Sequence, residues 1–182
     1  MKPVATIAIA MLALLTSLWP STRPATACGY HGILGDGFSA QHASSMNVAF
    51  ALRDAADAGV IESKALNPKF ADMLALHRAT QRLEKLREAL QHTADGASPP
   101  AFSLLLIESG MWNDFSVEGE AVRLKVHVDA PARGGAAVVT GDAVLAAVAA
   151  GRLSAAEALR RGLVVVDGPP ELMQALAAAL AR

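Results

Sequence analysis

The stretch that decides the fold is Thr140–Gly168, TGDAVLAAVAAGRLSAAEALRRGLVVVDG, which predicts two short helices followed by one short strand. Asp142 can cap the first helix by accepting from backbone amides two or three residues on, and Gly151 can end it in the left-handed conformation. Ser154 and Glu157 form an S-x-x-E capping box for the second helix. The four-residue apolar run near the end of the stretch then predicts a buried strand.

The residues around this stretch predict a sheet and one more helix. Phe102–Ile107 is apolar at nearly every position, as in a strand buried on both faces, whereas Val122–Val128 alternates apolar and polar residues. Trp112–Val117 and Ala136–Thr140 are further strand candidates, and Pro169–Glu171 begins a final helix. The predicted fold class is therefore α/β in the broad sense (α+β), a small and mostly antiparallel sheet of about five strands covered by helices.

Two helices are predicted before the sheet. Helical spacing of apolar residues occurs within Ser39–Val60 and again within Phe70–Leu90, where charged residues occupy the remaining surface. The expected organisation is a signal segment at 1–27, an N-terminal loop and helix extension at 28–68, and the sheet domain at 69–182.

The first residues resemble a secretory signal. Lys2 precedes the apolar run Ile7–Trp19, and the small residues Ala25–Ala27 provide a cleavage motif, so that the mature chain would begin at Cys28. The run is too short for a spanning helix, which needs roughly 20 apolar residues. We therefore expect an exported protein, periplasmic or secreted.

Charge and motif content exclude several function classes. Cleavage leaves 155 of the 182 residues and removes Lys2 and Arg23 from the 16 basic residues, so 14 remain against 17 acidic ones and the net charge is −3 with histidine neutral. Nucleic acid is not an expected partner, because the basic stripe that binds a phosphate backbone is missing. The chain also lacks the common nucleotide, zinc-peptidase and serine-hydrolase motifs, and it offers no residue that we would name as a catalyst.

The single cysteine, Cys28, could be free, acylated or bound to a metal. It cannot form an intramolecular disulfide. It could be acylated and tether the protein to a membrane surface, although Ala25 stands where lipoprotein signals usually carry an aliphatic residue. With His31, and with His42 brought in by folding, it could instead bind a metal. That alternative would make the chain a periplasmic accessory or interaction subunit of a redox or metal system.

The carboxyl-terminal third also resembles a known family. The residues that carry the resemblance are Thr140–Asp142, the helix around Leu145, Gly151–Ser154, Glu157–Ala158 and Gly162–Gly168. They look like the second half of the sterol carrier protein type two (sterol-binding domain) family, with the resemblance strongest over 136–180 and extending over about 70–182. It implies a five-stranded sheet whose helices enclose an apolar tunnel for sterols, fatty acids and other lipids.

The resemblance and the apolar helices together suggest a ligand site. The candidate lining residues are Leu145, Val148, Leu153, Leu159, Leu172, Met173 and Leu176, with Trp112 and Phe115 either sealing one end of the sheet or lying at the mouth of the tunnel. Each could equally be an ordinary core residue, because buried leucine and valine are the rule. The leading hypothesis is an exported, non-catalytic binding protein for a lipid or another apolar small molecule, with no cofactor.

Overall fold

The computed structural model describes residues 41–62, 72–92, 99–131 and 135–181. The predicted signal segment, Cys28 and His31 lie outside these residues. Within the described ranges, each helix is too short or too polar to cross a membrane.

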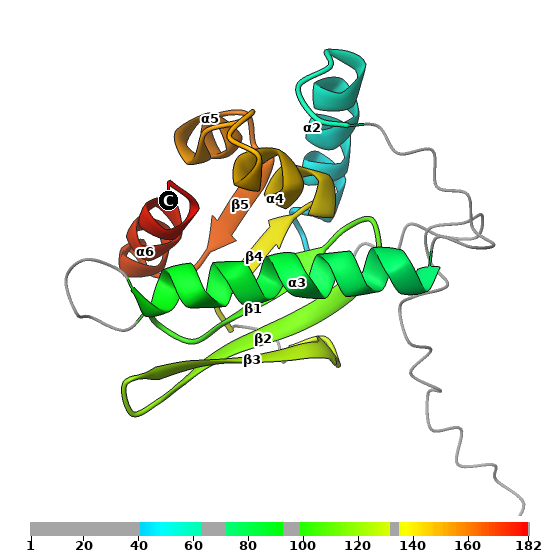
Figure 1. Ribbon diagram of the computed structural model, residues 1–182. Helices are drawn as coiled ribbons and strands as arrows, with labels where there is room; N and C mark the ends of the chain where they lie inside the picture. The colour runs from blue at the N-terminus through cyan, green and yellow to red at the C-terminus, as the bar shows by residue number, and fades with distance from the viewer. Residues whose placement is uncertain (1–40, 63–71, 93–98, 132–134, 182) are drawn as a thin grey trace, which may run out of the picture.

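A five-stranded mixed sheet forms the centre of the molecule (Figure 1). Its strands are β1 (Phe102–Leu106), β2 (Met111–Glu118), β3 (Ala121–Val128), β4 (Ala137–Thr140) and β5 (Val164–Asp167), arranged in the order β3-β2-β1-β4-β5. β1 pairs with β4 in parallel, and the other three pairings are antiparallel. The predicted fold class and the antiparallel meander of β1, β2 and β3 are confirmed.

Four helices follow the predicted order around this sheet. They are α3 (Asp72–Gln91), α4 (Asp142–Ala149), α5 (Ala155–Arg160) and α6 (Pro170–Leu180). α3 contacts β3, α6 and α4, and α5 contacts β5 and α6. Figure 1 shows α3 lying across the front of the sheet, with α4, α5 and α6 above it.

Register shows which face of the sheet α3 covers. On β3 the side chains of Val122 and Leu124 are buried or half-buried, whereas Arg123 and Lys125 are exposed. α3 packs on β3, so it must lie on the side of Val122 and Leu124. Leu124 pairs with Phe115, which pairs with Phe102, and we call the side that carries these residues the helix face.

The opposite side, which we call the back face, carries Ser103, Leu105, Trp112, Asp114 and Val139. It is defined by the pairing of Leu105 with both Trp112 and Val139, and of Ser103 with Asp114. Because side chains alternate along a strand, these residues point away from α3.

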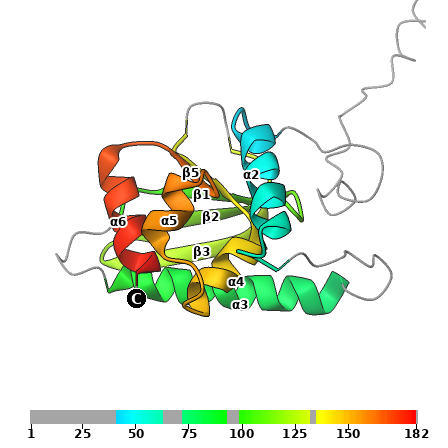
Figure 2. The same cartoon turned by 90° about the horizontal axis from the view of Figure 1, so that it is seen from above.

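The N-terminal extension lies partly on this back face. His42, three residues before α2 (Ser45–Asp57), places its ring 6.4 Å from the ring of Trp112 in an edge-on arrangement. α2 then contacts β4. In Figures 1 and 2, α2 and α6 lie toward opposite ends of the strands. Neighbouring strands and helices bury β1, whose five residues are all buried.

Two glycines fix the ends of α4 and α5. Gly151 and Gly162 both have φ of +68°, and an added Cβ would meet no atom within 4 Å. Their role is conformational, because only glycine adopts this region without a steric penalty. The predicted helix ends are confirmed.

Candidate functional site

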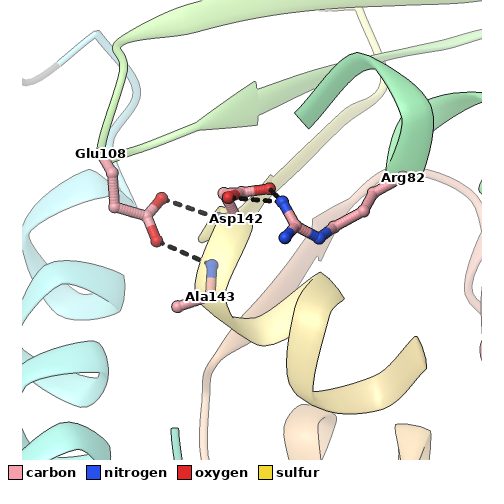
Figure 3. A network of polar contacts seen from close by, with 4 residues as sticks. All are labelled: Arg82, Glu108, Asp142 and Ala143. Atoms are coloured by element: carbon pink, nitrogen blue, oxygen red, sulfur yellow. Dashed lines mark hydrogen bonds and ion pairs between the residues drawn. The ribbon is translucent and has the colours of Figure 1, made fainter. Parts of the chain in front are cut away.

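A carboxylate from the end of β1 holds the start of α4 (Figure 3). Glu108 Oε2 accepts a hydrogen bond from the Asp142 amide at 2.8 Å, and Oε1 accepts from the Ala143 amide at 3.1 Å. These are two of the amides that a helix leaves unpaired at its first turn. The prediction that the Asp142 side chain caps this helix is wrong, because the residue at the cap position is Gly141 and Glu108 supplies the acceptor.

The Asp142 side chain instead binds α3. Nη1 of Arg82 donates to both Asp142 carboxylate oxygens, at 2.7 and 2.8 Å. The two side chains are only 18% and 26% exposed, so this ion pair is better shielded from solvent than a surface pair. Figure 3 shows Arg82, Asp142 and Glu108 forming one polar junction between α3, α4 and β1.

Gly141 lets this junction close. A Cβ at this position would lie 2.6 Å from Glu108 Oε1 and 2.9 Å from Leu52 Cδ2. Its φ of −110° is allowed for any residue, so glycine is needed here for space. Leu52 belongs to α2, which means that four elements meet around Gly141.

Burial is the main electrostatic influence on Glu108. It raises the pKa of the carboxyl above the ordinary 4.5, while the amides of Ala143 and Asp142 act in the opposite direction and the Asp142 carboxylate adds a smaller upward effect. Because the carboxyl group of Glu108 accepts hydrogen bonds from two amides in the first turn of α4, it holds the start of that helix against the end of β1. Over the described residues, no three His, Cys, Asp or Glu side chains are placed to hold a metal ion.

The predicted lining residues occupy the layer of α4, α5 and α6. Leu145, Leu153, Leu172 and Leu176 are buried, while Val148 and Leu159 are half-buried against the core. Met173 is 46% exposed. The structure therefore brings the first six into the core and leaves the side chain of Met173 largely in solvent.

The two aromatic candidates do not act together. Trp112 and Phe115 are both buried, but they lie on opposite faces of β2, because Trp112 pairs with Leu105 and Phe115 pairs with Phe102. Phe115 stacks on Phe102 with ring centroids 4.7 Å apart. Only Phe115 belongs to the helix face, so the pair cannot close one end of the sheet jointly.

The metal candidates remain predictions. Cys28 and His31 lie outside the described residues. His42 is described, and its Nε2 lies 3.5 Å from Asp167 Oδ2 on the back face.

Glu108 and Arg82 were not singled out in the sequence. Their partners lie 34 and 60 residues away in the chain, so no local spacing marks them. The available signal was an acidic residue directly after a mostly apolar strand, a position that can face the start of a helix.

The chain matches no protein-family model and no curated protein in sequence. Among solved structures it is similar to sterol carrier protein 2 like 2 from Aedes aegypti, with a TM-score of 0.43 and 16% identity over 57% of this chain and 96% of that one. It is also similar to a crystal structure of sterol carrier protein 2, with a TM-score of 0.40 and 23% identity over 57% of this chain and 87% of the other.

A third similarity is to part of an enzyme. The sec-alkylsulfatase Pisa1 from Pseudomonas sp. matches with a TM-score of 0.36 and 14% identity, over 51% of this chain and 13% of the sulfatase. The solved structures that this chain resembles thus include sterol carrier proteins, the family predicted from Thr140–Gly168. These similarities concern the fold alone.

Proposed function

We propose that this protein binds a lipid or another apolar small molecule between its helix face and the layer of α3, α4, α5 and α6, without changing it chemically. The observation that carries the proposal is the chemistry of that wall. Its polar side chains are already engaged: Asn113 Nδ2 donates to the carbonyls of Leu104 and Met111 at 3.2 and 3.1 Å, and Thr140 Oγ1 donates to the Leu163 carbonyl at 2.9 Å.

A wall of this kind suits hydrocarbon. Buried leucine, valine and alanine side chains of α4, α5 and α6 supply contact area for a hydrocarbon. The polar side chains already have hydrogen-bond partners within the protein, so they would not hold water in the site. Burial of the ligand would contribute about 25 cal/mol for each Å² of apolar surface removed from water. Binding would require the helices to separate from the sheet, because the residues that face this layer pack against one another in the core.

The points at which α3 is attached limit where such separation can occur. Arg82 joins α3 to α4, and at the far end the Gln91 side chain donates to the Glu120 carbonyl and accepts from the Val122 amide, each at 2.6 Å. Among the described residues, these bonds join α3 to α4 and to the start of β3. The ligand would enter between α3 and α6, which contact each other.

Two measurements test the proposal. Protein from the native host should release lipid on organic extraction, detected by mass spectrometry, and purified protein should take up a fluorescent fatty acid or sterol. Absence of both would overturn the proposal. Val148→Trp, which adds bulk at a half-buried position of α4, should lower uptake about tenfold, whereas Ala149→Trp at the adjacent exposed position should leave it unchanged.

We further propose that the protein acts outside the cytoplasm. The support is the charged, apolar and small-residue order of Lys2, Ile7–Trp19 and Ala25–Ala27. Intact-mass measurement of protein from the culture medium or periplasm should show loss of residues 1–27. The same measurement reveals acylation of Cys28, and a full-length mass in the cytoplasmic fraction would contradict export.

A further inference from the structure

The back face contains a buried hydrogen-bond donor with no partner. Trp112 is 3% exposed, and its indole Nε1 meets no acceptor in the described part of the chain. A buried N–H without an acceptor is expensive, because it has lost its hydrogen bond to water. Buried tryptophan usually has a partner for this group, so its position calls for an explanation.

A second buried polar atom without a partner lies next to His42 in the chain. Gln41 Oε1 is inaccessible and accepts no hydrogen bond from the described residues. Gln41 directly precedes His42, whose ring meets the ring of Trp112 edge-on. The Gln41 side chain therefore begins one residue from the ring that contacts Trp112.

The backbone around Trp112 is also irregular. The register of β2 and β3 shifts between Trp112 and Asn113, as in a β-bulge. On β3, His127 has φ of +57° and is the one non-glycine residue with positive φ among those described. A bulge changes the direction of the side chains next to it. Residues with strained backbone angles are found more often at functional sites than elsewhere.

The charges around this site disfavour an anion. Asp114 and Asp167 both lie on the back face, and Asp114 already accepts from the Ser103 hydroxyl at 3.3 Å. His42 Nδ1 accepts from the Ser44 amide at 3.2 Å, which places the proton of a neutral ring on Nε2, facing Asp167. A carboxylate there would meet acidic side chains, and it could not donate to Gln41.

We infer that the back face binds the hydroxyl group of an uncharged molecule, which accepts from Trp112 Nε1 and donates to Gln41 Oε1. A hydroxyl supplies one donor and two acceptor positions, so it satisfies both unpaired groups. This site is separate from the proposed lipid site, because Trp112 faces away from α3. The surrounding side chains of Leu105 and Val139 are apolar and buried, which suits a small alkyl group next to the hydroxyl.

Two isomeric probes test this inference. The chain has two tryptophans, so Trp19→Phe in the full chain leaves Trp112 as the only indole, and its N–H is followed by NMR on ¹⁵N-labelled protein. 1-Butanol and diethyl ether have the same formula, but only the alcohol can donate. We expect 1-butanol to shift the Trp112 N–H signal and to bind about fivefold more tightly than the ether, the effect of one hydrogen bond. Butyrate should bind more weakly than either.

A variant at the acceptor provides the control. Gln41→Met keeps the length of the side chain and removes the acceptor, so the preference for 1-butanol over diethyl ether should disappear while the fold, checked by circular dichroism, is kept. Equal affinity for the two isomers in the unaltered protein would overturn the inference without any variant. So would an indole N–H that contacts a long-lived bound water which no probe displaces.

Discussion

Substitution of Gly141 by alanine should destabilise the protein through one identifiable contact. The new Cβ would lie 2.6 Å from Glu108 Oε1, closer than real side chains approach, so the carboxylate must leave the start of α4. The hydrogen bonds from the Asp142 and Ala143 amides would then be lost. Hydrogen bonds to a charged group contribute about 1.5 to 3 kcal/mol each, and return of the carboxylate to water recovers part of that.

The backbone effect of the same substitution has the opposite sign. Because the φ of −110° suits alanine, Gly141→Ala should stabilise by about 0.4 to 1 kcal/mol through the unfolded chain. We expect a net loss of about 2 kcal/mol in the free energy of unfolding, measured by urea denaturation. Hydrogen exchange at the Asp142 and Ala143 amides should accelerate in the variant.

A double-mutant cycle isolates the contact. In a Glu108→Ala background the clashing oxygen is gone, and only the flexible Leu52 methyl groups remain, at 2.9 and 3.0 Å. Gly141→Ala should then cost less than about 1 kcal/mol. If the cost is the same in both backgrounds, or if Gly141→Ala unfolds at the same urea concentration as the unaltered protein, the role assigned to Glu108 is wrong.

Three further outcomes follow from the same geometry. Burial raises the pKa of Glu108 in the folded state above the ordinary 4.5. The contribution of this group to stability is therefore present below pH 4.5 and is lost as the pH rises through the folded pKa. Glu108→Gln should remove that part of the pH dependence of the free energy of unfolding, measured with urea. Arg82→Ala should cost about 2 kcal/mol because it leaves a shielded carboxylate unpaired, whereas Arg53→Ala, at an 81% exposed position, should stay within about 0.5 kcal/mol by thermal or urea unfolding. Leu176→Ala should cost about 2 to 4 kcal/mol, and Met173→Ala on the exposed side of the same helix should cost much less in the same assay.

Local signals predicted most of the secondary structure. Ser154 Oγ accepts from the Glu157 amide at 3.2 Å, as the capping box requires, because both groups lie within one turn. The Glu157 carboxylate, however, pairs with Arg160 and Arg161 on its own helix. Only half of the predicted box is formed, since nearby cations compete with the backbone for that carboxylate.

Long-range pairings account for what the sequence did not reveal. The parallel pairing of β1 with β4 and the bonds from Glu108 to α4 depend on segments more than 30 residues apart, and no periodicity reports them. The misassigned cap at Asp142 has the same cause. Its carboxylate could accept from its own helix, but Arg82 on α3 offers a full positive charge, and a charge-assisted bond is stronger than a bond to an amide.

The separation of Trp112 from Phe115, in contrast, could have been foreseen. Residues three apart share a face on a helix, but on a strand the period of two places them on opposite faces. The period of two therefore assigns the two aromatic residues to different faces of the sheet. Phe115 lies on the helix face, where the side chains of Asn113 and Thr140 donate to backbone carbonyls. Trp112 lies on the back face, where its own buried indole N–H has no partner among the described residues. A hydrocarbon needs the first environment and a hydroxyl needs the second. The two proposed sites therefore differ in chemistry, and each is tested with its own kind of probe.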